Sequence, residues 1–238
     1  MSTPNPFRSV PVAGSTASRG GSSALSTNSV LRNTYLLLSA TLLFSALMAG
    51  VSMAMGAPRG AGMVCSLVSL GLLWFVVPRT ANSANGIWVV FAVTGLLGFG
   101  LGPVLNSYIG RFANGSQIVM MAFGLTGSIF VGLSAYAVKS GRDFSFMRGF
   151  VYGGVMLAFV MSIGLLVASM FGYYFQPLAL AISAMFALLM CGMILSQTSD
   201  IIHGVETNYI LATISLYLAI YNLFVSLLQL LGFAAGDD

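Results

Sequence analysis

The sequence predicts an all-α integral membrane protein with seven transmembrane helices, the last of them central in the bundle. Of its 238 residues, 58% are hydrophobic and only 6% are charged, whereas a soluble domain carries about 25% charged residues. Seven apolar segments without a charged residue follow a polar N-terminal stretch. The last segment also carries a regular row of polar side chains, which predicts a position inside the bundle.

The apolar segments have lengths that suit membrane-spanning helices, since a helix needs about 20 residues to cross the hydrocarbon core. Turn-forming residues separate them, as at Gly56-Ala57-Pro58 and Gln176-Pro177. The second segment is the shortest. The expected spans are residues 33–56, 61–77, 86–105, 116–138, 149–172, 177–196 and 208–233, which form one domain over residues 31–238.

Residues 1–30 are predicted to form a disordered cytoplasmic tail. Ser, Gly, Thr, Ala and Pro dominate this stretch, which contains Arg8 and Arg19 and no acidic residue. It is too poor in apolar residues to bury a core, and it lacks the apolar run of a cleavable signal peptide. Two interpretations stay open: a passive leader segment, or a flexible segment that another protein assembly can bind and pull.

Lysine and arginine predict the orientation, because they accumulate in cytoplasmic loops. With the N-terminus in the cytoplasm, seven basic residues fall on that side and two on the other. Seven spans then place the C-terminus in the periplasm. The cytoplasmic set is Arg8, Arg19, Arg32, Arg79, Lys139, Arg142 and Arg148; the opposite set is Arg59 and Arg111.

Small residues four apart predict close helix packing. The pairs Gly98/Gly102 and Gly149/Gly153 have this spacing, and Gly124, Ser128 and Gly132 repeat it in the fourth span. Pro103 is expected to bend or break the third span, because proline removes a helix hydrogen bond. Asn106 and Tyr108 are candidates to satisfy the groups freed there.

The last span has a polar face. Asn208, Ser215, Asn222 and Gln229 recur every seven residues, so they form one stripe that drifts by only ~20° per heptad. An unpaired polar group in hydrocarbon costs several kcal/mol. We therefore expect this helix to be hidden from lipid by the other six spans.

Candidate chemistry gathers after the sixth span. Asp200, His203 and Glu206 lie together in an expected cytoplasmic loop. One interpretation is a carboxylate that binds a cation or titrates, with His203 as a neighbour that senses pH; the other is a set of solvated loop residues. One histidine does not make a haem or zinc site, so no metal or cofactor is predicted.

Several function classes have no support. The sole histidine lies in a loop, which excludes a serine–histidine pair within the membrane. No span contains an acid for aspartyl proteolysis, and the sole lysine, Lys139, is not in the last span as a retinal protein needs. The dispersed basic residues make no nucleic-acid patch. The chain is therefore not expected to be an enzyme.

Four blocks carry a resemblance to the transmembrane Bax inhibitor motif family. They are Arg32–Tyr35, GPVLNSY at 102–108, KSGRDFSF at 139–146, and Asp200–Gly232, in which HGVETNYILATISLYLAIYNLFVSLLQLLG is the most specific. The run LSTNSVLRNTYLLLS resembles the bacterial YccA-type branch. The likeness begins near residue 25 and implies a seven-helix bundle with the last helix central.

The resemblance implies two functions. The bacterial branch is described as modulators of the membrane protease FtsH, which implies an inner-membrane protein that binds FtsH as a negative regulator or slow substrate. Other members are described as pH-sensitive calcium leak channels that use paired aspartates, which implies a Ca²⁺ or H⁺ leak gated at Asp200 as the alternative. Asp200 matches the first aspartate, but Ala219 stands at the second. Arg79 is a candidate ion-pair partner for Asp200.

Overall fold

The computed structural model describes residues 18–83, 85–173 and 175–236, and within these residues it is entirely helical. Seven of its helices or helical runs are long and apolar enough to cross a membrane, which confirms the predicted fold class. The long helices are α1 (Ser18–Ala54), α4 (Asn85–Arg111), α5 (Gly115–Ser140), α6 (Arg148–Met170), α7 (Gln176–Ile202) and α8 (Tyr209–Ala234).

The second span is built from three consecutive pieces. They are α2 (Arg59–Gly71), a π-helical turn η1 (Leu72–Val76) and α3 (Val77–Thr80), and together they provide a span from Gly60 to Thr80. The turn precedes Pro78, and Val77 donates its backbone N–H to the carbonyl of Leu72 five residues earlier. Trp74 and Phe75 of this turn are exposed, whereas Val77 is buried.

Helix α1 begins well before the first predicted span. It includes residues 18–30, which the sequence assigned to the disordered tail. The first apolar span itself runs from Ser29 to Ala54, close to prediction. Residues 1–17 of the predicted tail lie outside the described residues, so their disorder stays a prediction.

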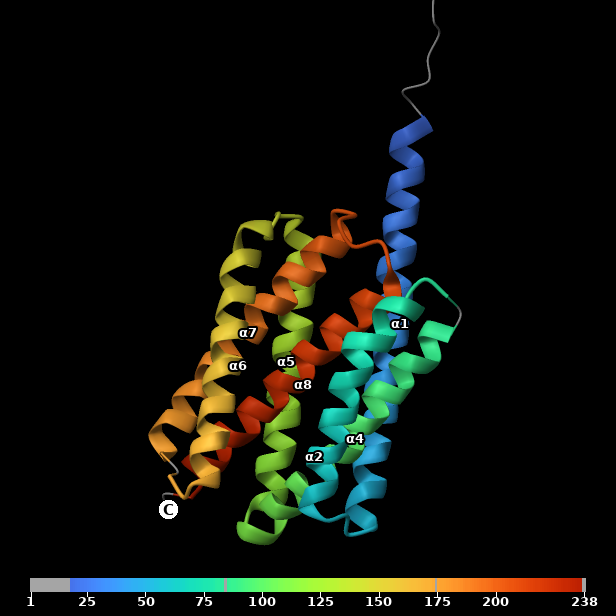
Figure 1. The fold of residues 1–238 in the computed structure, drawn as a ribbon. Helices are drawn as coiled ribbons and strands as arrows, with labels where there is room; N and C mark the ends of the chain where they lie inside the picture. Colours follow the sequence, from blue (N-terminus) through green and yellow to red (C-terminus); the bar gives the residue numbers. More distant parts are fainter. Residues whose placement is uncertain (1–17, 84, 174, 237–238) are drawn as a thin grey trace, which may run out of the picture.

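The basic loops meet at one end of the bundle. The loops after α3 and α5, and the loop between α7 and α8, lie at the end where α1 enters (top of Figure 1), and the intervening loops lie at the opposite end. The basic residues of the described part are therefore segregated as the sequence predicted, whereas Arg8 lies outside the described residues. The end with the α3, α5 and α7–α8 loops is called the inner end below, and the opposite end is called the outer end. That the inner end faces the cytoplasm stays a prediction.

Helix α8 crosses the bundle obliquely between the other helices (Figure 1). It is the most buried of the seven described spans, with 61% of its apolar window buried compared with 11% for the second and fifth spans. It packs chiefly against α1, α4, α5 and α7. The prediction of a central last helix is confirmed, but four spans rather than six provide most of its cover.

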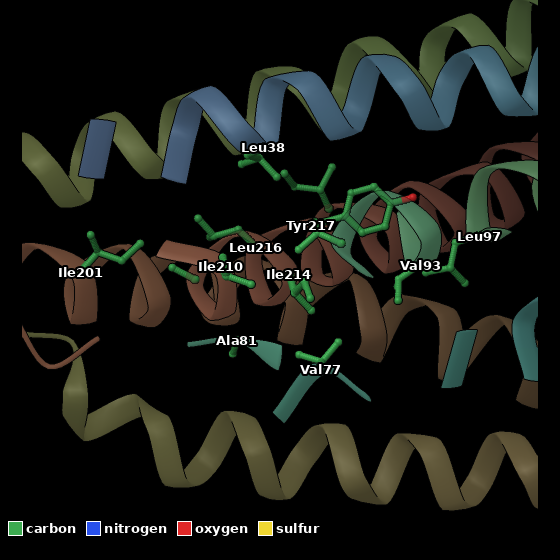
Figure 2. Packing of buried hydrophobic residues seen from close by; sticks show 13 residues of the cluster. Leu38, Val77, Ala81, Val93, Leu97, Ile201, Ile210, Ile214, Leu216 and Tyr217 are labelled. Atoms are coloured by element: carbon green, nitrogen blue, oxygen red, sulfur yellow. The ribbon is translucent and has the colours of Figure 1, made fainter. Parts of the chain in front are cut away.

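The core around α8 is apolar on the inner half of the bundle. Its side chains come from α1, α3, α4, α7 and α8 and converge on Leu216 and Tyr217 (Figure 2). The labelled members are Leu38, Val77, Ala81, Val93, Leu97, Ile201, Ile210, Ile214, Leu216 and Tyr217.

Tyr217 joins three helices at the centre of this core. Its side chain is 1% exposed. Its hydroxyl lies 2.7 Å from the hydroxyl of Ser45 on α1 and 3.2 Å from the carbonyl of Thr94 on α4. With Ser45 as one partner and Thr94 accepting, the buried phenol is fully satisfied, as a polar group in the membrane interior must be.

Glycines hold α1 against α4 at backbone distance. A Cβ added to Gly98 would overlap the backbone carbonyl of Ser45, and one added to Gly102 would overlap Ser52. The Gly98/Gly102 prediction is therefore confirmed as a helix contact. The Gly149/Gly153 prediction is wrong, because a Cβ at either position meets no atom within 4 Å.

Pro103 does not break its helix, since α4 continues to Arg111. The amide nitrogen of Asn106 donates to the carbonyl of Met53 on α1, at 3.2 Å. Asn106 therefore ties two helices together instead of satisfying a group freed by the proline.

We expect Gly98→Ala to destabilise the folded protein by about 1–3 kcal/mol, because the methyl group has to force the backbone of α1 away from α4. Thermal unfolding of the purified protein in detergent measures this loss. Gly153→Ala is the matched control and is expected to leave the unfolding temperature unchanged or slightly raised, since alanine favours a helix over glycine. Equal unfolding temperatures for the two variants would contradict the proposed contact.

Candidate functional site at the Asp200 end of the bundle

Asp200 lies inside helix α7, in its last turn, rather than in the predicted loop. Its carboxylate forms an ion pair with the guanidinium of Arg148, the first residue of α6. The two side chains are 17% and 38% exposed, respectively. The carboxylate is therefore partly withdrawn from water and neutralised by a cation from the neighbouring helix.

The predicted partner Arg79 does not pair with Asp200. Arg79 lies in α3 and donates to the carbonyl of Phe75 at 3.0 Å. The hydroxyl of Thr80, also in α3, donates to the carbonyl of Val76 at 2.9 Å. Arg148 is the better-placed cation because α6 packs along α7.

His203 joins the end of α7 to the loop after α5. Its Nδ1 lies 2.9 Å from the carbonyl of Ser199, and its Nε2 lies 3.2 Å from the carbonyl of Gly141. The hydroxyl of Ser199, 3.3 Å from Nδ1, also accepts the backbone N–H of Phe144 at 3.1 Å. Ser199 is 1% exposed. Both ring nitrogens therefore face the protein.

The remaining acids of this end stabilise turns. Asp143 accepts the backbone N–H of Ser145 at 2.8 Å, and this hydrogen bond is the main cause that lowers the pKa of Asp143, with smaller contributions from the Ser145 hydroxyl, His203 and Arg148. Glu206 accepts the backbone N–H of Asn208 at 2.7 Å. Neither carboxylate is an ion-pair partner of the described cations.

The four residues of the predicted polar stripe have separate roles. Asn208 is the N-cap of α8; its carbonyl oxygen accepts from Ile210 and Leu211, and its nitrogen donates to the carbonyl of Ala81 at 3.0 Å. Asn222 donates to Leu218 at 2.8 Å, and Gln229 accepts from Ser183 of α7 at 2.5 Å. Ser215 is half-buried.

Three residues that make contacts described above were not predicted from the sequence: Tyr217, Arg148 and Ser199. Tyr217 reads as an apolar residue in the pattern of the last span, although its hydroxyl is the buried polar contact of the helix centre. Arg148 was counted for orientation alone. The KSGRDFSF block, next to Arg148, was the available signal, because its loop packs against the end of α7 through Ser199.

The site offers one neutralised carboxylate and no carboxylate pair. Ala219, where the resembling channels carry a second aspartate, is 2% exposed and packs in an apolar cluster with Val151, Leu189 and Ile194. A site of paired aspartates needs two carboxylates, whereas the described residues place an arginine beside Asp200. The geometry suits a structural clasp between α6 and α7.

Taken together, the fold and this site define a seven-span helical membrane protein whose inner loops are closed by an ion pair and a histidine clasp. The profile of the family described as "Inhibitor of apoptosis-promoting Bax1" matches residues 27–236. The chain belongs to this Bax inhibitor family.

Relatives across the family match over most of the chain. The protein named "Modulator of FtsH protease YccA" of Escherichia coli K12 is 47% identical over 221 residues, which cover 93% of this chain and 97% of the relative. An uncharacterized membrane protein of Vibrio cholerae is 46% identical over 90% of this chain and 93% of its own. "Protein lifeguard 4" of the mouse is 29% identical over 71% of this chain and 67% of its own. The chain is a multi-pass inner-membrane protein, as its spans and these relatives show.

A double-mutant cycle tests which arginine pairs with Asp200. We expect Asp200→Asn and Arg148→Gln each to cost about 1 kcal/mol of stability, and the double variant to cost less than their sum, because each single change leaves one partly buried charge unpaired. Unfolding in detergent measures the coupling. The cycle of Asp200→Asn with Arg79→Gln is the control, and its two effects are expected to add; coupling to Arg79 instead would contradict the ion pair.

Proposed function

We propose that this chain is a non-enzymatic inner-membrane protein that binds the FtsH protease and modulates it as a slow or resistant substrate. The observation that carries the proposal is the 47% identity, over nearly the full length of both chains, to a protein named as a modulator of FtsH. What the fold adds is a physical reason for slow degradation.

A pulling protease that starts at the N-terminus would meet α1 first. Residues 1–17 precede this helix and are rich in Ser, Thr and Pro without an acidic residue, a composition that suits a segment the protease can bind and pull. The helix that must then leave the bundle is 37 residues long and contacts both α4 and the central α8.

Helix α1 is held at three levels of the membrane. Near its inner end, the Thr213 hydroxyl of α8 lies 3.3 Å from the carbonyl of Thr34, although it lies nearer to its own Tyr209 carbonyl at 2.7 Å. At mid-depth Ser45 bonds Tyr217 at 2.7 Å, and at the outer end Asn106 donates to Met53 at 3.2 Å. Breaking these bonds in hydrocarbon leaves polar groups without water, which opposes extraction.

The calcium or proton leak gated at Asp200 gains no support from the site. The carboxylate of Asp200 is paired with Arg148. Ala219 packs among apolar residues, so this position provides no second carboxylate that could share a proton or a cation with Asp200. We therefore favour the modulator.

Deletion of residues 2–17 is expected to slow degradation by FtsH severalfold while the bundle stays folded, because the described helix α1 remains whole. Pulse-chase turnover in cells with and without FtsH measures the effect, and thermal unfolding in detergent checks the fold. A variant in which residues 2–17 are replaced by a glycine–serine stretch of equal length is the control and should be degraded normally. Unchanged turnover of the deletion variant would refute a grip at this end.

Gly98→Ala is expected to speed FtsH-dependent turnover by several fold, because it weakens the α1–α4 contact that resists extraction. Gly153→Ala should leave the turnover at the parental rate, since its methyl group meets no neighbour. Turnover is again followed by pulse-chase, with a strain lacking active FtsH to exclude other proteases. If Gly98→Ala were degraded no faster, extraction of α1 would not limit the rate.

A further inference from the structure

A large cavity lies at the outer end of the bundle, away from the Asp200 site. It has a volume of about 860 Å³ and is enclosed by the end of α4, the α4–α5 loop, the start of α7 and the end of α8. Ligand cavities in proteins typically measure about 300–1,000 Å³. Gln229 and Ala179 also line a second, deeper cavity of about 270 Å³ among α6, α7 and α8.

The polar side chains of this cavity include hydrogen-bond donors. Arg111 lines it and has no ion pair or hydrogen bond among the described residues. The side-chain oxygen of Gln229 lies 2.5 Å from the hydroxyl of Ser183, which also lies 2.9 Å from the carbonyl of Ala179, and Gln229 lines the cavity as well. The amide groups of Gln176 and Asn114 lie in the same lining.

Among the described lining residues, the charge of the cavity is positive. Arg111 is the charged residue of the described lining, and no described carboxylate lines the cavity. An arginine guanidinium binds phosphate or carboxylate through paired N–H donors, and such charge-assisted bonds are about twice as strong as neutral ones.

The cavity walls are apolar and sit at the membrane surface. Phe112, Leu180 and Phe233 line it between the polar groups, and Tyr108 stacks on Phe112 with ring centroids 5.9 Å apart. Arg111 is the last residue of α4, so it lies at the level where the spans leave the hydrocarbon and lipid headgroups begin. It also lines a neighbouring cavity of about 710 Å³ beside the α1–α2 loop.

We propose that the outer cavity binds an anionic phosphodiester, with the phosphate at Arg111 and Gln229 and the apolar remainder against Phe112, Leu180 and Phe233. The headgroup of an anionic phospholipid from the same leaflet is the source that fits the apolar walls and the depth of Arg111. A soluble phosphate is the other source of the same chemistry.

Native mass spectrometry of the purified full-length protein tests this site, with phosphatidylglycerol and phosphatidylcholine of identical chains as probes. The parental protein is expected to retain phosphatidylglycerol at least about fivefold better. Arg111→Gln is expected to abolish this preference, because it removes a charge-assisted hydrogen bond. Lys139→Gln removes the same charge at the inner end and should keep the preference, and Arg111→Lys should keep part of it.

A second measurement distinguishes the sources. Inorganic phosphate and glycerol 3-phosphate are titrated against thermal unfolding of the lipid-free protein in detergent, and Arg111→Gln is checked for an unchanged helical circular dichroism spectrum. Stabilisation by phosphate that disappears in Arg111→Gln supports the site with a soluble anion as its source. Equal retention of the two lipids by the parental protein, together with no phosphate effect, overturns the proposal.

Discussion

The hydroxyl of Tyr217 and the close contact of α4 with α1 at Gly98 and Gly102 set the arrangement of the whole bundle. One hydroxyl contacts Ser45 and the carbonyl of Thr94, so it fixes α1, α4 and α8 at one level. The close approach of α1 and α4 at Gly98 is what brings Ser45 within reach. Because no water is present in hydrocarbon to replace a lost partner, this contact constrains both the depth and the rotation of the three helices. The packing of α5, α6 and α7 then builds on the opposite side of α8.

The two ends of the bundle differ in their chemistry. The inner end is closed by charge pairing and by a histidine that bonds two segments. The outer end is open, with a cavity that presents an unpaired cation and apolar walls. The inner end therefore presents paired charges, whereas the outer cavity presents the guanidinium of Arg111.

Sequence patterns predicted the spans well because hydrophobic length is a property of each segment by itself. Contacts between segments were harder. Gly98/Gly102 and Gly149/Gly153 have the same spacing, yet one pair packs and the other faces outward, since the motif does not say which helix is opposite. The central position of α8 was predicted from the stripe of Asn208, Ser215, Asn222 and Gln229, but a buried polar contact of this helix to α1 and α4 belongs to Tyr217, whose ring reads as apolar. Asp200 was placed in a loop because the uninterrupted apolar run ends near residue 196, although α7 continues to Ile202. Its partner was missed because ion pairing depends on how α6 lies beside α7.

Because of the π-helical turn at Leu72–Val76, the two parts of the second span, α2 and α3, face different neighbours. A turn of this kind contains one residue more than an α-helical turn, which rotates everything after it by about 100°. The α2 portion can thus present Gly62 to Gly100 of α4, while Val77 and Ala81 turn towards the start of α8. A regular α-helix of the same length would present these residues on different faces. The one additional residue of the π-helical turn therefore lets a single span pack against both α4 and α8.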